Sequence, residues 1–398
     1  MTRKKLLYIY MGGSRNVTSI HLKSRAQVRG MNEAGIDTHG YFFTEKVTEE
    51  EKLDDQLTLM PLPEYTGVHR YFQADHLSQF NYSHVLSVLK ERAKDFDFIF
   101  LRHIGNGPAY EELLEFIAHK TLLYVPSNRI RERYCERRYT VHNSWASAFF
   151  GWWEYFTYWR REKRLMKKFY PRLKGIVTFT PEFGRIIQRE SSKPMNIIYN
   201  RDGVDTAQVP ARSSKQKTGE EVKLIFLKGS ATEQRWAGIE RLMRSIEAYP
   251  QLKFKLYITG NAYKQPERYD KPFVSLTGRL PFKELDALID EVDLGVSNLE
   301  NYLIHFEETT NLKSRDYYSR GLPFIQSNTM PDIEGTEAAE FYLYIPNDDS
   351  IIDMQAVFDF AIRMRENQDH PEEMHRFAVE HLDWGITTGE LAKEILAS

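Results

Sequence analysis

Residues 307–325, EETTNLKSRDYYSRGLPFI, read as an acidic loop, a short helix and a buried strand. Two neighbouring threonines and Asn311 have side chains that accept hydrogen bonds from the free backbone amides at a helix start. Gly321, followed by Pro323, is typical of a helix end. The pattern therefore predicts one helix from Leu312 to Arg320.

Two carboxylates bracket the start of this helix. Glu308 lies in the loop just before it and Asp316 lies a little over one turn inside it, so both can face a ligand held at the helix N-terminus. The predicted helix start leaves free backbone amides at Thr310, Asn311 and Leu312. These amides and the positive end of the helix dipole favour an anion such as a diphosphate. Carboxylates accept hydrogen bonds from paired hydroxyls, as on a ribose or a hexose. The stretch thus indicates a nucleotide-sugar site, and a merely solvated polar face is the alternative.

Glu308, seven residues and Asp316 resemble the Glu-x7-Glu signature of glycosyltransferase family 4, a large family of retaining enzymes. The longer pattern LK-x-R-[E/D]-Y-x-x-RGLPF is similar to bacterial capsular and exopolysaccharide glycosyltransferases. This chain departs from the commonest form by having the shorter aspartate at the second acidic position. The resemblance implies that Glu308 holds hydroxyls of the donor sugar, that Asp316 holds the ribose, and that the helix start with Lys313 holds the diphosphate.

The resemblance also implies the α/β fold called GT-B, in which two Rossmann-like domains face each other across a cleft and a C-terminal helix crosses back to the first domain. At 398 residues the chain is long enough for two such domains. The polar tract at residues 210–221 suits a linker, and NRDGVD before it resembles the turn that ends the first domain in the family. We therefore predict an acceptor-binding domain over residues 1–205, a nucleotide-sugar-binding domain over 206–382 and a returning helix over 383–398.

Charge and cysteine content exclude several classes of function. Lys and Arg total 54 against 56 for Asp and Glu, so no global field draws the protein to nucleic acid. The single cysteine, Cys135, cannot form an internal disulfide and fits a reducing cytoplasm. The N-terminal apolar run is short and ends in a glycine pair, which predicts a first strand and no signal peptide. No window of the sequence approaches a membrane span.

Strand and helix patterns alternate through the first half of the chain, as in a parallel, doubly wound sheet. The first strand, residues 5–10, is followed by Gly12 and Gly13, which in the resembling family belong to a loop that faces the cleft; a tight turn with no ligand is the alternative. The strand FDFIFLR ends in Arg102 and His103, at the sheet edge where ligands bind in open α/β sheets. The resemblance implies that both face the sugar near the reacting bond, and a histidine satisfied within its loop is the alternative.

Residues 129–174 differ in composition from the rest of the chain. This segment carries 13 Lys and Arg against four Glu, a net charge of +9 in a protein of net −2, and its middle reads WASAFFGWWEYFTYW. Aromatic rings flanked by cations suit a segment that lies at an anionic membrane surface. The alternative is that the rings fill the domain core while the cations extend around it.

The second half of the chain repeats the alternation from residue 222 onward. Gly229 opens the loop after the first strand, and Arg235 in the same segment is the predicted partner of the diphosphate, with an ordinary surface arginine as the alternative. In the resembling family the backbone corresponding to residues 278–282, which starts with Gly278 and Arg279, meets the base.

Together these features predict a retaining glycosyltransferase that moves a sugar from a nucleotide-diphosphate sugar, with UDP favoured on family grounds, to a carbohydrate or polyprenyl-linked acceptor. Its expected setting is bacterial surface polysaccharide synthesis, in the cytoplasm and peripheral at the inner face of the membrane. A nucleotide-sugar epimerase of the same fold and a non-catalytic partner subunit are the rivals. A dehydrogenase is disfavoured because G-x-G-x-x-G follows neither first strand.

No cofactor and no metal site are expected from the sequence. Hard cations such as Mg²⁺ and Mn²⁺ require closely spaced carboxylates. Two closely spaced pairs in the second half of the chain are Glu291 with Asp293, before a buried strand, and Asp348 with Asp349, in a late loop. We interpret these pairs as a strand lead-in and a helix cap and expect no metal ion there. The negative charge of a diphosphate should then be met by the helix start, Lys313 and Arg235.

Overall fold

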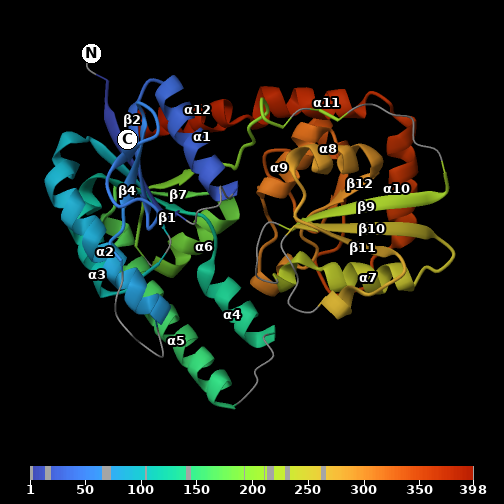
Figure 1. The fold of residues 1–398 in the computed structure, drawn as a ribbon, viewed down its shortest axis with the longest axis horizontal. Helices are drawn as coiled ribbons and strands as arrows, with labels where there is room; N and C mark the ends of the chain where they lie inside the picture. Colours follow the sequence, from blue (N-terminus) through green and yellow to red (C-terminus); the bar gives the residue numbers. More distant parts are fainter. Residues whose placement is uncertain are drawn as a thin grey trace. The chain divides into compact units, whose positions relative to one another are not determined.

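The chain folds into two compact units, shown in Figure 1. The computed structural model describes residues 3–13, 19–64, 73–103, 105–139, 145–191, 193–209, 211–212, 219–228, 234–260 and 266–397. The first unit comprises Met1–Arg201 together with Trp384–Ser398, and the second comprises Asp202–Asp383. The chain therefore passes into the second unit a few residues before the boundary predicted from the NRDGVD turn.

An eight-stranded sheet, in the order β3-β4-β2-β1-β5-β6-β7-β8, forms the centre of the first unit. All pairings are parallel except that of β3 with β4. Its strands are β1 (Lys5–Gly13), β2 (Asp37–Thr44), β3 (Glu51–Lys52), β4 (Leu57–Pro61), β5 (Phe98–Arg102), β6 (Thr121–Val125), β7 (Gly175–Thr178) and β8 (Ile197–Tyr199). Every residue of β5, β6 and β7 is buried, as expected for a parallel sheet covered on both faces.

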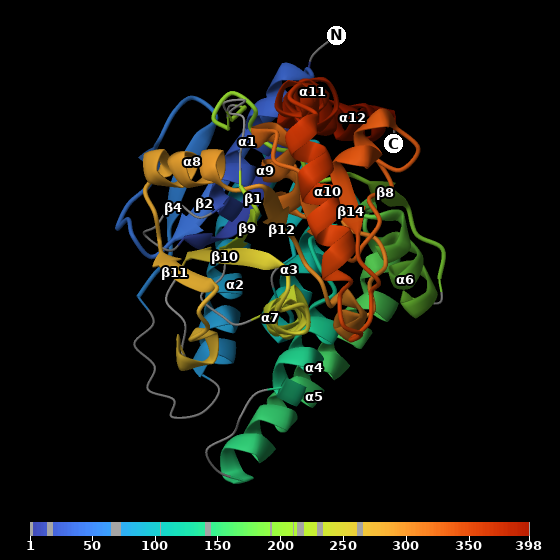
Figure 2. The same ribbon diagram turned by 90° about the vertical axis from the view of Figure 1, so that its right-hand side faces the viewer.

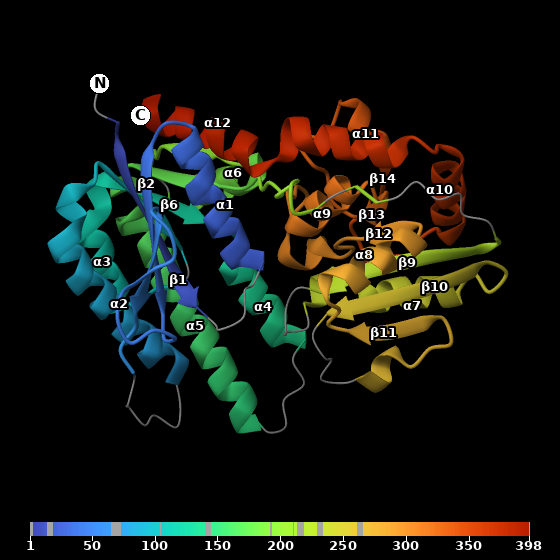
Figure 3. The ribbon, with the colours of Figure 1, turned by 45° about the horizontal axis from the view of Figure 1, so that its top comes forward.

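Helices α1 (Ser19–Glu33), α2 (Gln73–Arg92), α3 (Pro108–Ile117), α4 (Arg129–Tyr139), α5 (Trp145–Lys168), α6 (Pro181–Ser191) and α12 (Trp384–Ala397) complete this unit. The last of them confirms the returning helix, because Leu391 and Ile395 are buried in the hydrophobic cluster of the first unit. Helix α12 lies beside α1, as Figure 3 shows. Their approach requires Gly30, since a Cβ there would lie 2.8 Å from the Cβ of Thr388.

The second unit, which Figure 2 turns toward the reader, contains a six-stranded, fully parallel sheet in the order β11-β10-β9-β12-β13-β14. Its strands are β9 (Glu221–Lys228), β10 (Lys253–Gly260), β11 (Val274–Gly278), β12 (Leu294–Val296), β13 (Phe324–Gln326) and β14 (Tyr342–Tyr344). Its helices are α7 (Ile239–Glu247), α8 (Phe282–Glu291), α9 (Leu312–Arg320), α10 (Met354–Glu366) and α11 (His370–Phe377). Both sheets are those of Rossmann-like units, so the predicted fold class is confirmed.

Each sheet has a point at which the order of the strands reverses. In the first unit the chain adds strands on both sides of β1, so the reversal falls between β1 and β5. In the second unit it falls between β9 and β12. Ligands of open α/β sheets bind outside the carboxyl ends of the strands at such a switch point. The fold therefore offers one candidate binding position in each unit.

Candidate functional site

Helix α9 begins and ends at the residues that the sequence predicted. The side chain of Asn311 accepts a hydrogen bond from the backbone amide of Ser314 at 3.0 Å, which satisfies one of the amides that a helix start leaves free. Gly321 ends the helix in the left-handed conformation, with φ of 68°. A Cβ at this position would also lie 2.4 Å from the backbone of Pro371, so the position excludes other residues on two grounds.

Tyr317 anchors α9 over the switch point of the second unit. Its hydroxyl donates to the carbonyl of Val296 at 3.0 Å and lies 3.3 Å from that of Ile225, so it contacts both strands that flank the reversal. The ring can approach because residue 295 is glycine; a Cβ there would lie 2.8 Å from the ring. Ser297, directly after β12, contacts the capping side chain of Asn311 at 3.0 Å. The N-terminus of α9 therefore lies at the carboxyl end of β12.

Lys313 lies in the first turn of α9 and is partly buried. Its ammonium donates to Oδ1 of Asn298 at 2.8 Å and lies 4.3 Å from the centre of the Phe226 ring, at the end of β9. Burial lowers the pKa of Lys313 to about 7. Within the described part of the chain no carboxylate forms an ion pair with it. A cation, a helix N-terminus and the carboxyl end of a central strand thus meet at one place, which suits an anionic ligand.

Glu308 is fixed through its backbone. The residues on either side of it pair with Thr329, since the amide of Thr309 donates to the Thr329 carbonyl and the Thr329 amide donates to the Glu307 carbonyl, each at 2.9 Å. The side chain of Glu308 is partly buried. The loop that carries this carboxylate is therefore attached to the segment that follows β13.

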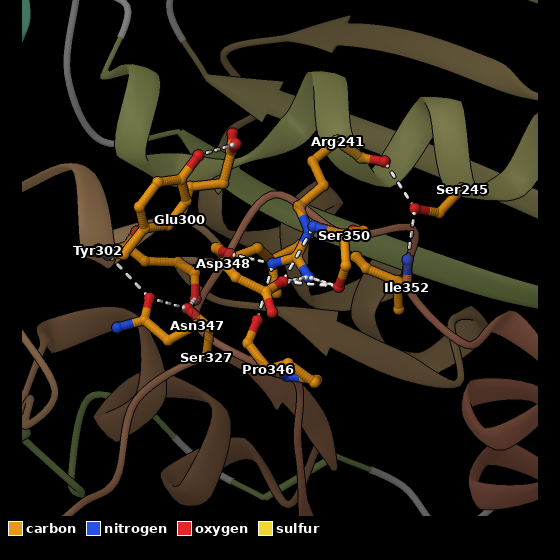
Figure 4. Close-up of polar contacts among 12 residues, drawn as sticks. Arg241, Ser245, Glu300, Tyr302, Ser327, Pro346, Asn347, Asp348, Ser350 and Ile352 are labelled. Atoms are coloured by element: carbon orange, nitrogen blue, oxygen red, sulfur yellow. Dashed lines mark hydrogen bonds and ion pairs between the residues drawn. The ribbon is translucent and has the colours of Figure 1, made fainter.

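Arg241, a fully buried residue of α7, holds the start of the same loop, as Figure 4 shows. Its Nη1 donates to the carbonyls of Leu299 and Pro346, at 2.7 and 2.9 Å, and its Nε donates to the carbonyl of Ser350 at 2.8 Å. Its Nη2 lies 3.1 Å from the carboxylate of Asp348. One guanidinium thus joins the segment after β12 to the segment after β14. The sequence offered no signal for this role.

Asn347 continues this support toward Glu308. Its side-chain amide donates to the carbonyl of Phe306 at 2.9 Å and to the carboxylate of Glu307 at 3.1 Å. Its oxygen accepts from the backbone amide of Tyr302 at 2.8 Å. The loop before α9 is therefore held by side chains that do not belong to it, an arrangement that keeps a functional carboxylate in one geometry.

Asp316 has a partner that sequence reasoning missed. Its carboxylate forms an ion pair with Nε of Arg320 at 3.0 Å, and Arg320 also pairs with Asp286 of α8. Burial raises the pKa of Asp316, and Arg320 counteracts it. The spacing of four residues along one helix could have indicated the pair.

The remaining donor-site candidates are not all placed at the switch point. Arg235 forms an ion pair with Glu240, which also pairs with Arg268, so its guanidinium is not reserved for a diphosphate as the sequence suggested. Gly229 lies outside the described residues. Gly278 and Arg279 are exposed at and just after the carboxyl end of the edge strand β11.

In the first unit, Gly12 and Gly13 belong to β1 and do not form the expected turn. The strand continues to Gly13, which pairs with Thr44 after an irregularity at Met11. The residues that follow, 14–18, lie outside the described part of the chain. The apolar run that predicted the strand ended at Tyr10, but pairing with β2 extends regular backbone beyond it.

The ring of His103, which the resemblance implied to face the sugar, is held among side chains of the first unit, as in the alternative of a satisfied histidine. It is only 2% exposed, its Nε2 lies 3.0 Å from the carboxylate of Glu162, and its Nδ1 lies 3.0 Å from the hydroxyl of Tyr110. Glu162 also accepts from the side-chain amide of Asn106 and the hydroxyl of Tyr170, at 3.1 and 3.0 Å. Both ring nitrogens thus have a polar neighbour within 3.0 Å, and the histidine joins the end of β5 to helix α5.

The buried contact between His103 and Glu162 requires the Glu162 carboxyl to be ionised. Burial alone raises the pKa of its carboxyl, but the charge of His103 and the hydrogen bonds it accepts outweigh burial and hold the pKa below the usual value of 4.5. A lowered pKa contributes stability that is present above about pH 4.5 and is lost as the pH falls through the folded-state value.

We expect Glu162→Gln to lower the free energy of unfolding by about 3 kcal/mol, because it leaves buried His103 without its charged partner. Urea denaturation at neutral pH measures this. Glu154→Gln on the same helix is the matched control, since Glu154 pairs with Arg133 and Arg137 in a half-exposed position and should cost less than about 1 kcal/mol. Equal losses in the two variants would contradict a structural role for the His103 pair.

Comparisons with known proteins agree on the fold. No protein-family model matches the chain, and no curated protein matches it in sequence. Solved structures match it over its full length. A sucrose-phosphate synthase from Thermosynechococcus elongatus has a TM-score of 0.66 at 13% identity, covering 99% of this chain and 100% of that one. WaaG, a glycosyltransferase involved in lipopolysaccharide biosynthesis, has a TM-score of 0.64 at 11% identity, with coverage of 99% and 100%.

Anabaena Alr3699/HepE, solved in complex with UDP and glucose, has a TM-score of 0.60 at 10% identity, covering 100% of both chains. Identities this low show the fold alone. The chain therefore has the α/β architecture of GT-B glycosyltransferases.

Proposed function

We propose that the protein is a retaining glycosyltransferase that transfers a sugar from a nucleotide-diphosphate sugar, UDP being the favoured nucleotide, to a carbohydrate or polyprenyl-linked acceptor. The observation that carries the proposal is the cation at the switch point of the second unit. Lys313 projects from the first turn of α9 against the ends of β9 and β12 and has no carboxylate partner in the described chain. Glu308 lies in the supported loop that leads into the same helix.

Each of these groups has a role in the proposed reaction. The diphosphate leaving group gains charge as its bond to the sugar breaks, and the amides at the start of α9 with the ammonium of Lys313 stabilise that charge. Glu308 accepts hydrogen bonds from hydroxyls of the donor sugar. Asp316 accepts from the ribose while Arg320 orients its carboxylate.

The proposed donor site needs no divalent ion. Amide donors and one cation meet the charge of the diphosphate without one. We therefore expect transfer to continue in EDTA, at a rate close to that with added Mn²⁺. Loss of all transfer on chelation, with recovery on adding Mn²⁺, would contradict this part of the proposal.

The test of the function has two stages. Thermal shift against UDP, GDP, ADP and CMP sugars identifies the donor, which should stabilise the protein by mass action. Radiolabelled donor is then incubated with and without lipid-linked saccharide acceptors, and the anomeric configuration of the product is read by NMR. Retained configuration in an acceptor-dependent product supports the proposal. Formation of an epimer or of free sugar without acceptor would indicate the epimerase instead, and absence of binding to every sugar nucleotide would indicate a non-catalytic subunit.

A pH dependence follows from Lys313. A diphosphate binds the protonated amine of Lys313, whose pKa in the free protein is about 7. The affinity for UDP should therefore fall as the pH rises above about 7. Between about pH 7 and pH 9 we expect Kd to rise roughly tenfold or more, since one pKa unit corresponds to a factor of ten. Calorimetric titration measures this, and Lys313→Met should remove the dependence. An identical pH profile in the variant would exclude Lys313 from the site.

The proposal places the enzyme at the inner face of the membrane in bacterial surface polysaccharide synthesis, because of helix α5. Figure 3 shows one end of α5 projecting from the first unit. Large aromatic side chains of its first two-thirds are 39% to 83% exposed: Trp145, Phe149, Phe150, Trp153, Phe156 and Trp159. Arg160, Arg164, Lys167 and Lys168 are exposed toward its C-terminal end. Among the described residues no helix is long and apolar enough to cross a bilayer.

The two sides of α5 differ in a way that bears on both readings of this segment, the membrane surface and the domain core. Tyr155 and Tyr158 fill the core, as the core alternative expected. The six exposed rings are not core residues. Aromatic rings followed by cations along one helix match an interface in which rings enter the headgroup region and ammonium and guanidinium groups contact anionic lipid.

A further inference from the structure

Among the described residues, Arg102 is a buried cation without an anionic partner. It ends β5 at the switch point of the first unit and is 7% exposed. Its Nη1 is buried and has no hydrogen-bond partner, and no ion pair is formed by the side chain within the described chain. The guanidinium instead lies over an aromatic ring, with its carbon 5.3 Å from the centre of the Tyr124 ring on β6.

A second cation lies at the same ring. The ammonium of Lys23, on α1, donates to the hydroxyl of Tyr124 at 2.6 Å and lies 4.8 Å from the centre of its ring. It also lies 5.5 Å from the centre of the Trp384 ring. Lys23 is 4% exposed. Two buried positive charges thus converge on Tyr124 at the carboxyl edge of the sheet.

Burying an unpaired charge is unfavourable, and a ring face offsets only part of the cost. Because this charge lies at the ligand-binding edge of an open sheet, it is placed to pair with an anionic ligand. Arg102 offers a guanidinium, which presents its donors in a planar fork, and Lys23 offers an ammonium. Together these donors match the oxygens of a phosphate.

We propose that the first unit binds the phosphate of a lipid-linked acceptor at Arg102, with Lys23 and Tyr124 completing the subsite. The acceptor identity rests on the proposed glycosyltransferase function, whereas the anion site does not. A lipid phosphate is favoured over a sugar phosphate because His103, the next residue, is joined to Glu162 of α5, the helix that carries the exposed rings. The subsite is thus directly linked to the element that we place at the membrane.

The test uses the full chain with UDP at saturation, so that the site in the second unit is filled. Affinity for inorganic phosphate, dodecyl phosphate and glucose 1-phosphate is measured by calorimetry for the parent, Arg102→Met and Arg102→Lys. Arg29→Met is the matched control, since Arg29 is an exposed arginine of α1 near Glu33. Melting temperatures are recorded in phosphate-free buffer.

Arg102→Met should raise the melting temperature by about 2 °C or more, because removing an unpaired buried charge relieves its desolvation. It should weaken phosphate binding at least tenfold, and Arg102→Lys, which keeps the charge but loses the planar fork, should weaken it by a smaller factor. Arg29→Met should stay within about threefold of the parent. A lower melting temperature or unchanged phosphate affinity in Arg102→Met would overturn the site.

Dodecyl phosphate should bind the parent at least tenfold more tightly than glucose 1-phosphate, in an Arg102-dependent manner. The reverse order would overturn the lipid assignment. UDP affinity, measured first for every variant, should not change with Arg102. Failure of the parent to bind UDP would count against the proposed function and leave the phosphate result to be judged separately.

Discussion

Glu308→Gln is expected to lower the turnover of sugar transfer at least a hundredfold without changing the fold. The substitution keeps the shape of the side chain but removes its charge and turns one acceptor oxygen into a donor. Hydrogen bonds to hydroxyls that strengthen in the transition state are then lost, and a hundredfold corresponds to about 2.7 kcal/mol. The backbone pairing with Thr329 does not involve the side chain, so stability should be preserved.

The chain supplies a control next to this residue. Glu307 is exposed, and its carboxylate accepts from Asn347 at 3.1 Å. Glu307→Gln keeps the loop and should reduce turnover less than about fivefold. Initial rates with the identified donor, and denaturation midpoints for both variants, separate chemistry from folding. A Glu308→Gln variant that transfers sugar at the parental rate would refute the assignment.

Removing three rings of α5 is expected to lower the affinity for anionic vesicles by roughly a thousandfold. Trp145, Trp153 and Phe156 are 83%, 57% and 54% exposed. Moving each ring from water into the interface contributes about 1.5 kcal/mol or more, so changing all three to serine costs upward of about 4 kcal/mol, or three decades in Kd. Co-sedimentation with vesicles of increasing anionic lipid measures the affinity.

The matched control for the triple variant is Phe282→Ser, which removes a ring that is 72% exposed in the second unit. Its vesicle affinity should equal that of the parent. Binding of the parent should also fall with salt, because the cations of α5 are screened. Parental binding that is indifferent to anionic lipid and to the three rings would leave α5 without a membrane role.

Local signals predicted α9 to the residue, because its cap, its end and its glycine are set by neighbours in sequence. The partner of His103 could not be predicted in the same way. Glu162 lies on a helix far along the chain, and only the packing of α5 against β5 brings the two together. Arg235 shows an intermediate case: Glu240 is close in sequence, but the pair forms across Gly238, whose φ of 73° turns the chain between them.

The two donor-site carboxylates illustrate the same limit. Their spacing predicted that both could face a ligand at the helix start, and that spacing is local. The pairing of Asp316 with Arg320 is local to α9 as well, but the further contact of Arg320 with Asp286 depends on how α8 packs beside α9. Nor could any pattern in the sequence indicate that Arg241 and Asn347 support the loop before α9, because their partners are backbone atoms of distant segments.

The return of the chain to the first unit has a consequence for its synthesis. The second unit is one continuous segment. The hydrophobic core of the first unit is incomplete until residues 384–398, which form α12, emerge from the ribosome. Domains fold as their segments become available, so the unit made second should be the first to reach its native state. A chain that ends at Asp383 should keep the protease resistance of the second unit and lose that of the first, and equal resistance in both would contradict this order.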